Sequence, residues 1–269
     1  MTKALEMTIL DDGSESPISF KYLRKFNLAM GILHLVQGVA MLVLGFFWDF
    51  SRPLYSITLD YSGGPPVAAL QPEFSFTAVG PTVAAFLLFS ALAHLLIAGP
   101  LNKFYVKNLK KKMNPIRWFE YAFSSSIMVF FIAILFGVWD LWVLIGLFFL
   151  NMLMNLFGHM MELHNQTTKK TNWTAYIYGW IAGIIPWVII SVFFARIAIN
   201  STGMPWFVPV IYAFELILFM SFAFNMLLQY KKVGKWKDYL YGERMYQILS
   251  LVAKTLLAWL VFAGVFQPA

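Results

Sequence analysis

The stretch Leu249–Gly264, LSLVAKTLLAWLVFAG, decides the fold, because it is apolar enough to cross a membrane and yet contains Lys254. An ammonium group in hydrocarbon costs about 2.5–3.5 kcal/mol even on translocon-insertion scales. The neighbours of Lys254 in this stretch are almost all apolar, and it lies too deep to reach the membrane surface easily. We therefore expect another membrane segment to supply a counter-charge.

The composition of the chain is that of an integral membrane protein. Of its 269 residues, 60% are hydrophobic and 12% are charged, whereas soluble domains carry about 25% charged residues. There is no cysteine, which excludes disulfides and thiolate–metal sites. Residues 1–20 are polar and mildly acidic, so we expect no cleavable signal peptide.

Seven segments are long and apolar enough to span a bilayer, which takes about 20 residues. They are residues 26–47, 79–99, 116–138, 141–162, 174–197, 206–230 and 246–266. We predict an all-α membrane protein, with a seven-transmembrane-helix bundle over 26–266 after an N-terminal segment 1–25. The longest connection, 48–78, mixes β-formers with Gly-Gly-Pro-Pro, so a short β-hairpin is expected in it. The sequence shows no internal repeat and no second domain.

The basic residues divide unevenly between the two ends of these spans. The N-terminal segment and the loops 2–3, 4–5 and 6–7 hold 17 of them, whereas the other side has only Arg52 and Arg196. By the positive-inside rule, the N-terminus is cytoplasmic and the C-terminus extracellular. The net charge of +7 therefore indicates membrane topology and contact with anionic lipid rather than nucleic acid. Docking of a soluble partner on the basic loops is the alternative.

Ionisable side chains inside the predicted spans are candidate functional groups. They are His34, His94, Glu120, His159, Glu215 and Lys254. At 1.5 Å per residue, His34, His94, Glu120 and Lys254 fall in one layer, about 7–12 Å below the cytoplasmic surface. Glu120 is the only carboxylate in that layer, so it is the expected partner of Lys254. A single membrane histidine, in contrast, is more often a packing residue.

Serines accompany both charged groups. Ser250 precedes Lys254 by one helical turn and shares its face, and Ser124 follows Glu120 by one turn. Membrane serines often bond only to their own backbone, so a structural role stays open for them. A desolvated lysine suits Schiff-base chemistry, because its amine can act as a nucleophile toward a carbonyl group.

Four motifs carry a resemblance to a known family. They are RWFEYAFSSSIM (117–128), IAGIIPWV (181–188), GKWKDYLYGER (234–244) and ILSLVAKTLLAW (248–259). Together with seven spans, a lysine in the last span and an N-terminus inside, they resemble the heliorhodopsins, microbial-type rhodopsins with inverted orientation. The resemblance covers essentially the whole chain.

The resemblance implies a cofactor and roles for individual residues. Lys254 is expected to bind all-trans retinal as a protonated Schiff base, with Glu120 as counterion and Ser250 hydrogen-bonding nearby. His34 and His94 match the family's polar cavity, which is expected to reach Glu120 through water. The implied retinal pocket contains Ser124, Ser125, Met128, Asn151, Pro186, Trp187, Phe219 and Phe222. The resemblance also implies a homodimer.

Three functions remain open from the sequence. The first is a light-sensing photoreceptor in the cell membrane, not an enzyme, which has a slow photocycle and signals to an unknown cytoplasmic partner. It is favoured because no second carboxylate follows Glu120 in its span. The second is a light-gated or light-driven proton transporter using Glu120 and Glu215. The third is a non-photochemical transporter or membrane enzyme using Lys254.

Overall fold

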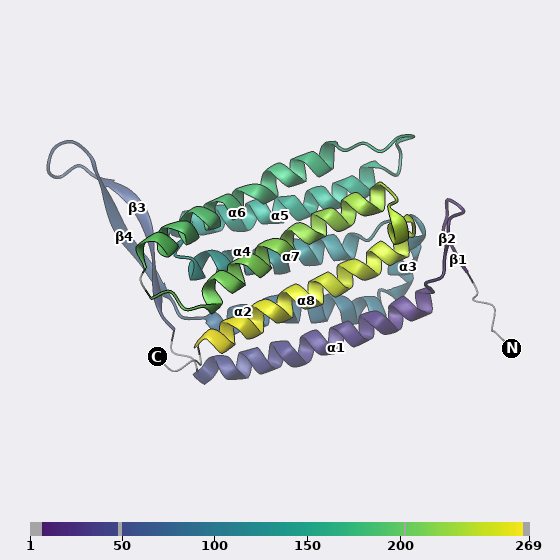
Figure 1. Cartoon of the computed structure of the whole chain (residues 1–269), viewed down its shortest axis with the longest axis horizontal. Coiled ribbons are helices and arrows are strands. Elements are labelled where there is room, and N and C mark those ends of the chain that lie inside the picture. The colour runs from purple at the N-terminus through teal and green to yellow at the C-terminus, as the bar shows by residue number, and fades with distance from the viewer. Residues whose placement is uncertain (1–6, 48–49, 202, 266–269) are drawn as a thin grey trace.

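Seven long helices form a single bundle in the computed structural model, which describes residues 7–47, 50–201 and 203–265 (Figure 1). The helices are α1 (Phe20–Leu44), α2 (Val79–Ala98), α4 (Pro115–Leu135), α5 (Leu141–His164), α6 (Thr174–Asn200), α7 (Phe207–Tyr230) and α8 (Tyr239–Val265). Each is long and apolar enough to cross a membrane. The predicted seven-helix bundle is thereby confirmed.

Helix α4 is the most enclosed of the seven. Of its apolar window, 67% is buried inside the protein, against 11% for α7. It packs against α2 and α5, while α1 contacts both α2 and α8. Glu120 lies on α4 and Lys254 on α8, so the two charged residues of the sequence analysis are on helices whose buried faces meet inside the bundle.

Two helices begin earlier than predicted. Helix α1 begins at Phe20, with the Ser19 side chain accepting a hydrogen bond from the Tyr22 backbone N–H, and α8 begins at Tyr239. The predicted starts, 26 and 246, followed the drop in hydropathy at charged residues. The charged residues at the start of α1 are exposed on the helix surface, whereas Glu243 of α8 is buried and paired inside the bundle. Residue 266, the predicted end of the last span, lies outside the described residues.

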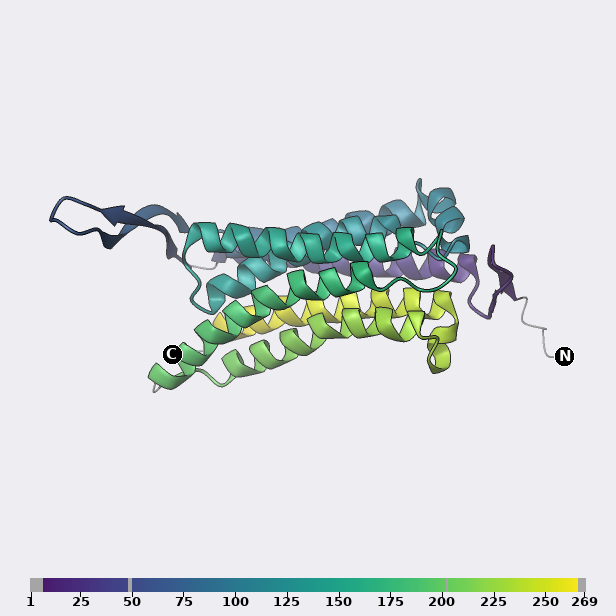
Figure 2. The same ribbon diagram turned by 90° about the horizontal axis from the view of Figure 1, so that it is seen from above.

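Short elements cover the two ends of the bundle. At one end, here called the α3 end, lie α3 (Asn102–Lys110), the hairpin of β1 (Thr8–Ile9) and β2 (Glu15–Ser16), and the 3-10 helix η2 (Gly234–Lys237). The sequence analysis predicted none of them. At the opposite end, β3 (Arg52–Asp60) and β4 (Val67–Phe76) form an antiparallel hairpin that is longer than the short one expected. Both views show it extending beyond the helices (Figures 1 and 2).

A close helix contact positions α1 against α2. The 3-10 helix η1 (Gly45–Phe47) continues α1, and a Cβ atom added at Gly45 would lie 2.5 Å from the Cα of Gly80. Only glycine allows two backbones to approach this closely. The contact holds together the two helices that carry His34 and His94.

Candidate functional site: a buried lysine–glutamate pair

Lys254 and Glu120 form an ion pair inside the bundle. The Lys254 Nζ donates to Glu120 Oε1 at 2.9 Å and to Ser250 Oγ at 2.8 Å. Their side chains are only 3% and 5% exposed. Desolvating a charge costs several kcal/mol, and a nearby opposite charge with further hydrogen bonds offsets that cost. The geometry thus joins the groups that the sequence analysis placed in one layer.

Two residues that the sequence analysis did not name complete the surroundings of this pair. Ser90 on α2 donates to Glu120 Oε1 at 2.5 Å. The Lys254 ammonium lies 5.1 Å from the centre of the Tyr121 ring, within the range of a cation–π contact. Both were inconspicuous in the sequence, since a serine and a tyrosine in apolar helices carry no distinctive signal.

The two predicted cavity histidines lie together. The rings of His34 and His94 stack with centroids 5.6 Å apart. His94 Nδ1 lies 2.8 Å from Asn27 Oδ1, whereas neither ring nitrogen of His34 has a hydrogen-bond partner among the described residues. Buried polar atoms of this kind are commonly satisfied by water. Ser90 lies one helical turn before His94, so the histidines adjoin the Glu120 side of the pair.

An apolar cavity leads away from the Lys254 amine. It is small, about 40 Å³ in volume, and several predicted pocket residues line it. They are Ser125, Met128, Phe219, Phe222 and Ser250, joined by the unpredicted Tyr121, Met154, Asn155 and Ala253. A second cavity, of about 70 Å³, shares five of these residues and reaches Trp187 and Gly183. The walls of both cavities are mostly apolar, as is common in ligand pockets.

Three predicted pocket residues do not line either cavity. Asn151 donates to Ser125 Oγ at 2.7 Å and to Ser126 Oγ at 3.1 Å, and it is Asn155, one turn later, that reaches the cavity wall. Pro186 is buried within α6, beside Trp187. Ser124 is buried one turn after Glu120. These three positions were carried over from the family resemblance, which gives the helix that lines the pocket but not which side chain reaches the cavity wall.

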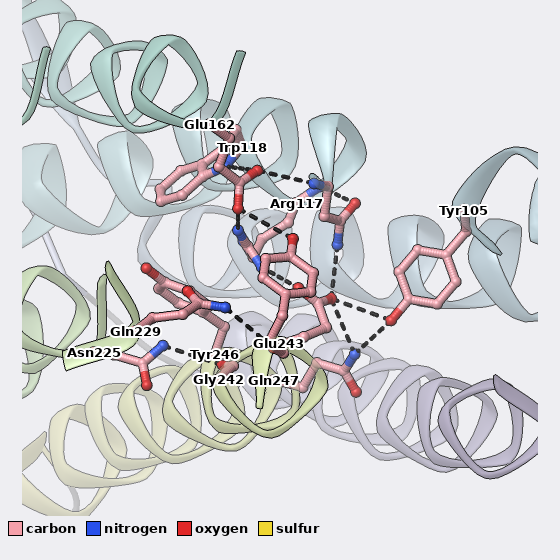
Figure 3. Close-up of polar contacts among 12 residues, drawn as sticks. Tyr105, Arg117, Trp118, Glu162, Asn225, Gln229, Gly242, Glu243, Tyr246 and Gln247 are labelled. Atoms are coloured by element: carbon pink, nitrogen blue, oxygen red, sulfur yellow. Dashed lines mark hydrogen bonds and ion pairs between the residues drawn. The ribbon is translucent and has the colours of Figure 1, made fainter. Parts of the chain in front are cut away.

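A second ionic cluster lies nearer the α3 end, and we call it the Arg117 cluster (Figure 3). The guanidinium of Arg117 on α4 binds Glu162 of α5 at 2.5 Å and also pairs with Glu243 of α8. All three side chains are at most 4% exposed. Arg117 is one of the 17 basic residues counted for topology, and the structure places it in the first turn of α4, buried and paired, rather than in the loop.

Both carboxylates of the Arg117 cluster accept further hydrogen bonds. Glu162 accepts from the Asn114 backbone N–H, Trp118 Nε1 and Tyr239 OH. Glu243 accepts from Tyr105 OH, Asn114 Nδ2 and Gln247 Nε2. With two glutamates and one arginine, the cluster carries a formal charge of −1, which these donors help to stabilise. Figure 3 shows the donors converging on the two carboxylates from several helices.

Fold and site together define a class: a multi-pass membrane protein with a desolvated lysine amine beside an apolar cavity. The sequence profile of the heliorhodopsin family matches residues 23–266. The chain therefore belongs to the heliorhodopsins, which are retinal-binding, light-sensing membrane proteins. No curated protein matches it. The chemistry of its residues fits the retinal that this family implies, since a buried primary amine, which can condense with an aldehyde, lies among apolar and aromatic side chains.

The Arg117 cluster generates a stability prediction. We expect Glu162→Gln to lower the free energy of unfolding by about 2–6 kcal/mol, because the amide NH₂ that replaces one carboxylate oxygen faces two buried donors and leaves them unpaired, at about 1–3 kcal/mol each. The matched control is Asp12→Asn, which removes the charge from the exposed pair with Lys112 and should cost less than about 1 kcal/mol. Unfolding in detergent, followed by circular dichroism, measures both. Equal effects in the two variants would contradict the prediction.

Proposed function

We propose that this protein is a photoreceptor in which Lys254 carries all-trans retinal as a protonated Schiff base. The supporting observation is the Lys254 amine, buried beside an apolar cavity and paired with Glu120. When bound, retinal supplies the absorption of visible light and the change of shape that follows. The other tasks fall to the residues around the nitrogen.

Glu120 is proposed as the counterion. Its carboxylate lies 2.9 Å from the nitrogen and would keep the positive charge there stable in a dry environment. The hydroxyl of Ser90 donates to the same carboxylate oxygen, and Ser250 accepts from the nitrogen. These two hydroxyls fix the direction in which the nitrogen's proton points.

The stacked histidines are proposed to receive the proton after light absorption. Asn27 Nδ2 donates to Leu23 O, so Asn27 Oδ1 faces His94 Nδ1 as an acceptor. The proton of neutral His94 is therefore on Nδ1, and Nε2 is left free to accept another. Signalling is favoured over pumping because no second carboxylate follows Glu120 in α4.

Orientation and partners belong to the proposal as well. The excess of lysine and arginine on one side supports a cytoplasmic α3 end in the cell membrane. Contact with membrane lipid, a homodimer and a cytoplasmic signalling protein are expected from the composition and the family. No role in binding nucleic acid is proposed.

The first test is loss of colour. Lys254→Ala should abolish the visible absorption band after addition of all-trans retinal, and Lys254→Arg should do the same while keeping the charge opposite Glu120. The exposed Lys235→Ala serves as control and should keep the band. Visible spectra of the purified proteins decide the matter, and a pigment that survives in Lys254→Arg would refute the linkage.

The second test concerns Glu120. In Glu120→Gln the buried cation loses its partner, so its proton should be lost at a lower pH than in the wild type, with absorption moving to the ultraviolet, unless chloride takes the place of the carboxylate. Absorbance is titrated with pH in the presence and absence of chloride. Glu73→Gln, on β4 far from the pair, is the control. An unchanged titration in both conditions would exclude Glu120 as counterion.

The third test addresses orientation, and the absence of cysteine makes it direct. Ser62→Cys lies in the exposed turn between β3 and β4, and Lys111→Cys is exposed at the α3 end. A membrane-impermeant maleimide added to intact cells should label the first variant and not the second. The reverse pattern would overturn the proposed topology.

Glu215 supports the transporter as a second candidate function. It lies on α7 with no exposed surface, and neither carboxylate oxygen has a hydrogen-bond partner among the described residues. An isolated carboxylate is strongly disfavoured in such a place, so a neutral carboxyl group would store one proton there. It would form a second station, on a different helix from Glu120.

Voltage clamp separates the two functions. Transport predicts light-dependent current that disappears in Glu215→Gln while the visible band remains. The photoreceptor proposal predicts no current in either protein. Current that persists unchanged in Glu215→Gln would remove Glu215 from the path.

A further inference from the structure

A series of polar contacts connects the histidines with the Arg117 cluster. His94 Nδ1 lies 2.8 Å from Asn27 Oδ1, Asn27 Nδ2 lies 3.5 Å from Tyr105 OH, and Tyr105 OH lies 3.1 Å from Glu243 Oε1. Asn27 is on α1, Tyr105 on α3 and Glu243 on α8. All of these side chains are buried. Two ionic sites that lie at different depths in the bundle are thus joined by two residues.

The donors in this series all point toward the Arg117 cluster. Asn27 uses its oxygen toward His94 and its N–H group toward Tyr105. Burial, and then the negative charge of Glu243, raise the pKa of Tyr105 well above its usual value. The hydroxyl therefore stays protonated and donates a hydrogen bond to the Glu243 carboxylate. Gln247 Nε2 also donates to the Tyr105 oxygen, at 3.1 Å.

Asn27 cannot relay a proton along this series, because an amide neither gains nor loses one readily near neutral pH. It can transmit a change in hydrogen-bond strength, since adjacent hydrogen bonds polarise one another in a medium of low dielectric constant. The contact between Asn27 and Tyr105 is long, at 3.5 Å, and well-formed bonds of this kind measure about 2.7–3.2 Å. It therefore has room to shorten.

Tyr105 is also the buried polar side chain of α3, which is attached at its end by the Asp11 backbone N–H donating to Lys110 O. This nine-residue helix buries only Tyr105 and Leu109, and its remaining residues include Lys103, Lys107 and Lys110. Leu109 packs in an apolar cluster with Leu23 and Leu240. Apolar packing of this kind is not directional, unlike a hydrogen bond. The Tyr105 hydroxyl is the group on α3 that reaches Glu243, as Figure 3 shows.

We propose that Tyr105 is a coupling residue, which transmits the charging of His94 to Glu243 and so tightens the attachment of the basic helix α3. The inference rests on the proposed photoreceptor function. His94 takes up at Nε2 the proton that leaves the Lys254 nitrogen and becomes an imidazolium. Its Nδ1–H bond to Asn27 is then charge-assisted and stronger, and the polarised amide N–H binds Tyr105 more closely. Helix α3, whose attachment is tightened, carries the lysines proposed to face a cytoplasmic partner.

The test follows a spin label on α3. Because the chain has no cysteine, Lys107→Cys creates a single, exposed labelling site. In the retinal-loaded protein in lipid nanodiscs, illumination should make the nitroxide less mobile, with a time course matching the recovery of the visible band. A label at Ser62→Cys, at the opposite end of the bundle, should not respond.

Tyr105→Phe in the Lys107→Cys background removes the hydroxyl and keeps the ring. We expect loss of the light-induced mobility change, with the visible band and its photocycle retained. The matched control is Tyr22→Phe. Tyr22 is an exposed tyrosine in the first turn of α1, outside this series of contacts. Asn27→Leu interrupts the same series without touching Tyr105 or Glu243, so it too should abolish the response. Spectra recorded in the dark show whether α3 remains docked in each variant.

The outcomes separate this inference from the proposed function. A protein without pigment or photocycle contradicts the photoreceptor proposal itself. A normal photocycle with an unresponsive or more mobile label on α3 overturns the coupling. A response that persists in both Tyr105→Phe and Asn27→Leu also overturns it. Loss in both variants, with a normal response in Tyr22→Phe, supports it.

Discussion

The rest of the structure depends on one interaction, the ion pair between Lys254 and Glu120. A lysine inside a membrane helix is costly, and the cost is offset only if its partner is close and both are otherwise hydrogen-bonded. This constrains α8 to face α4 at one depth and requires Ser90 and Ser250 beside the charges. It also explains why α4, which carries Glu120, is the most enclosed helix.

The bundle contains two ionic sites with opposite demands. Around Lys254, one carboxylate and two hydroxyls adjoin a small apolar cavity. Around Arg117, two carboxylates and many donors fill the interior. The first site suits chemistry that changes charge, and the second suits a rigid junction between α4, α5 and α8. The hydrogen-bonded series between them therefore connects a site whose charge can change, at Lys254, with a rigid one, at Arg117.

Hydropathy predicted the seven spans, because the bilayer demands about 20 apolar residues from each. It failed where charges are neutralised within the protein. Glu243 appeared to lie outside the last span, before its predicted start at residue 246. Helix α8 nevertheless begins at Tyr239, and the Glu243 carboxylate is paired with Arg117 inside the bundle. The short helix α3 was missed since its lysines conceal the two buried positions, Tyr105 and Leu109. Asn155, which lines the cavity beside Lys254, was not predicted, because the pocket residues came from a family resemblance and no local pattern gives the rotation of α5.

The sequence by itself determined the class of protein, the number of spans, and the lysine and glutamate that had to meet. Those features follow from composition and from the cost of an isolated charge in hydrocarbon, which depend on residue types and their depth along each helix. Only the tertiary structure decided which polar groups share a contact: Ser90 with Glu120, Arg117 with Glu162 and Glu243, and Tyr105 with both Asn27 and Glu243. Such contacts join helices far apart in the chain, and they depend on helix rotation and packing, which no local pattern specifies.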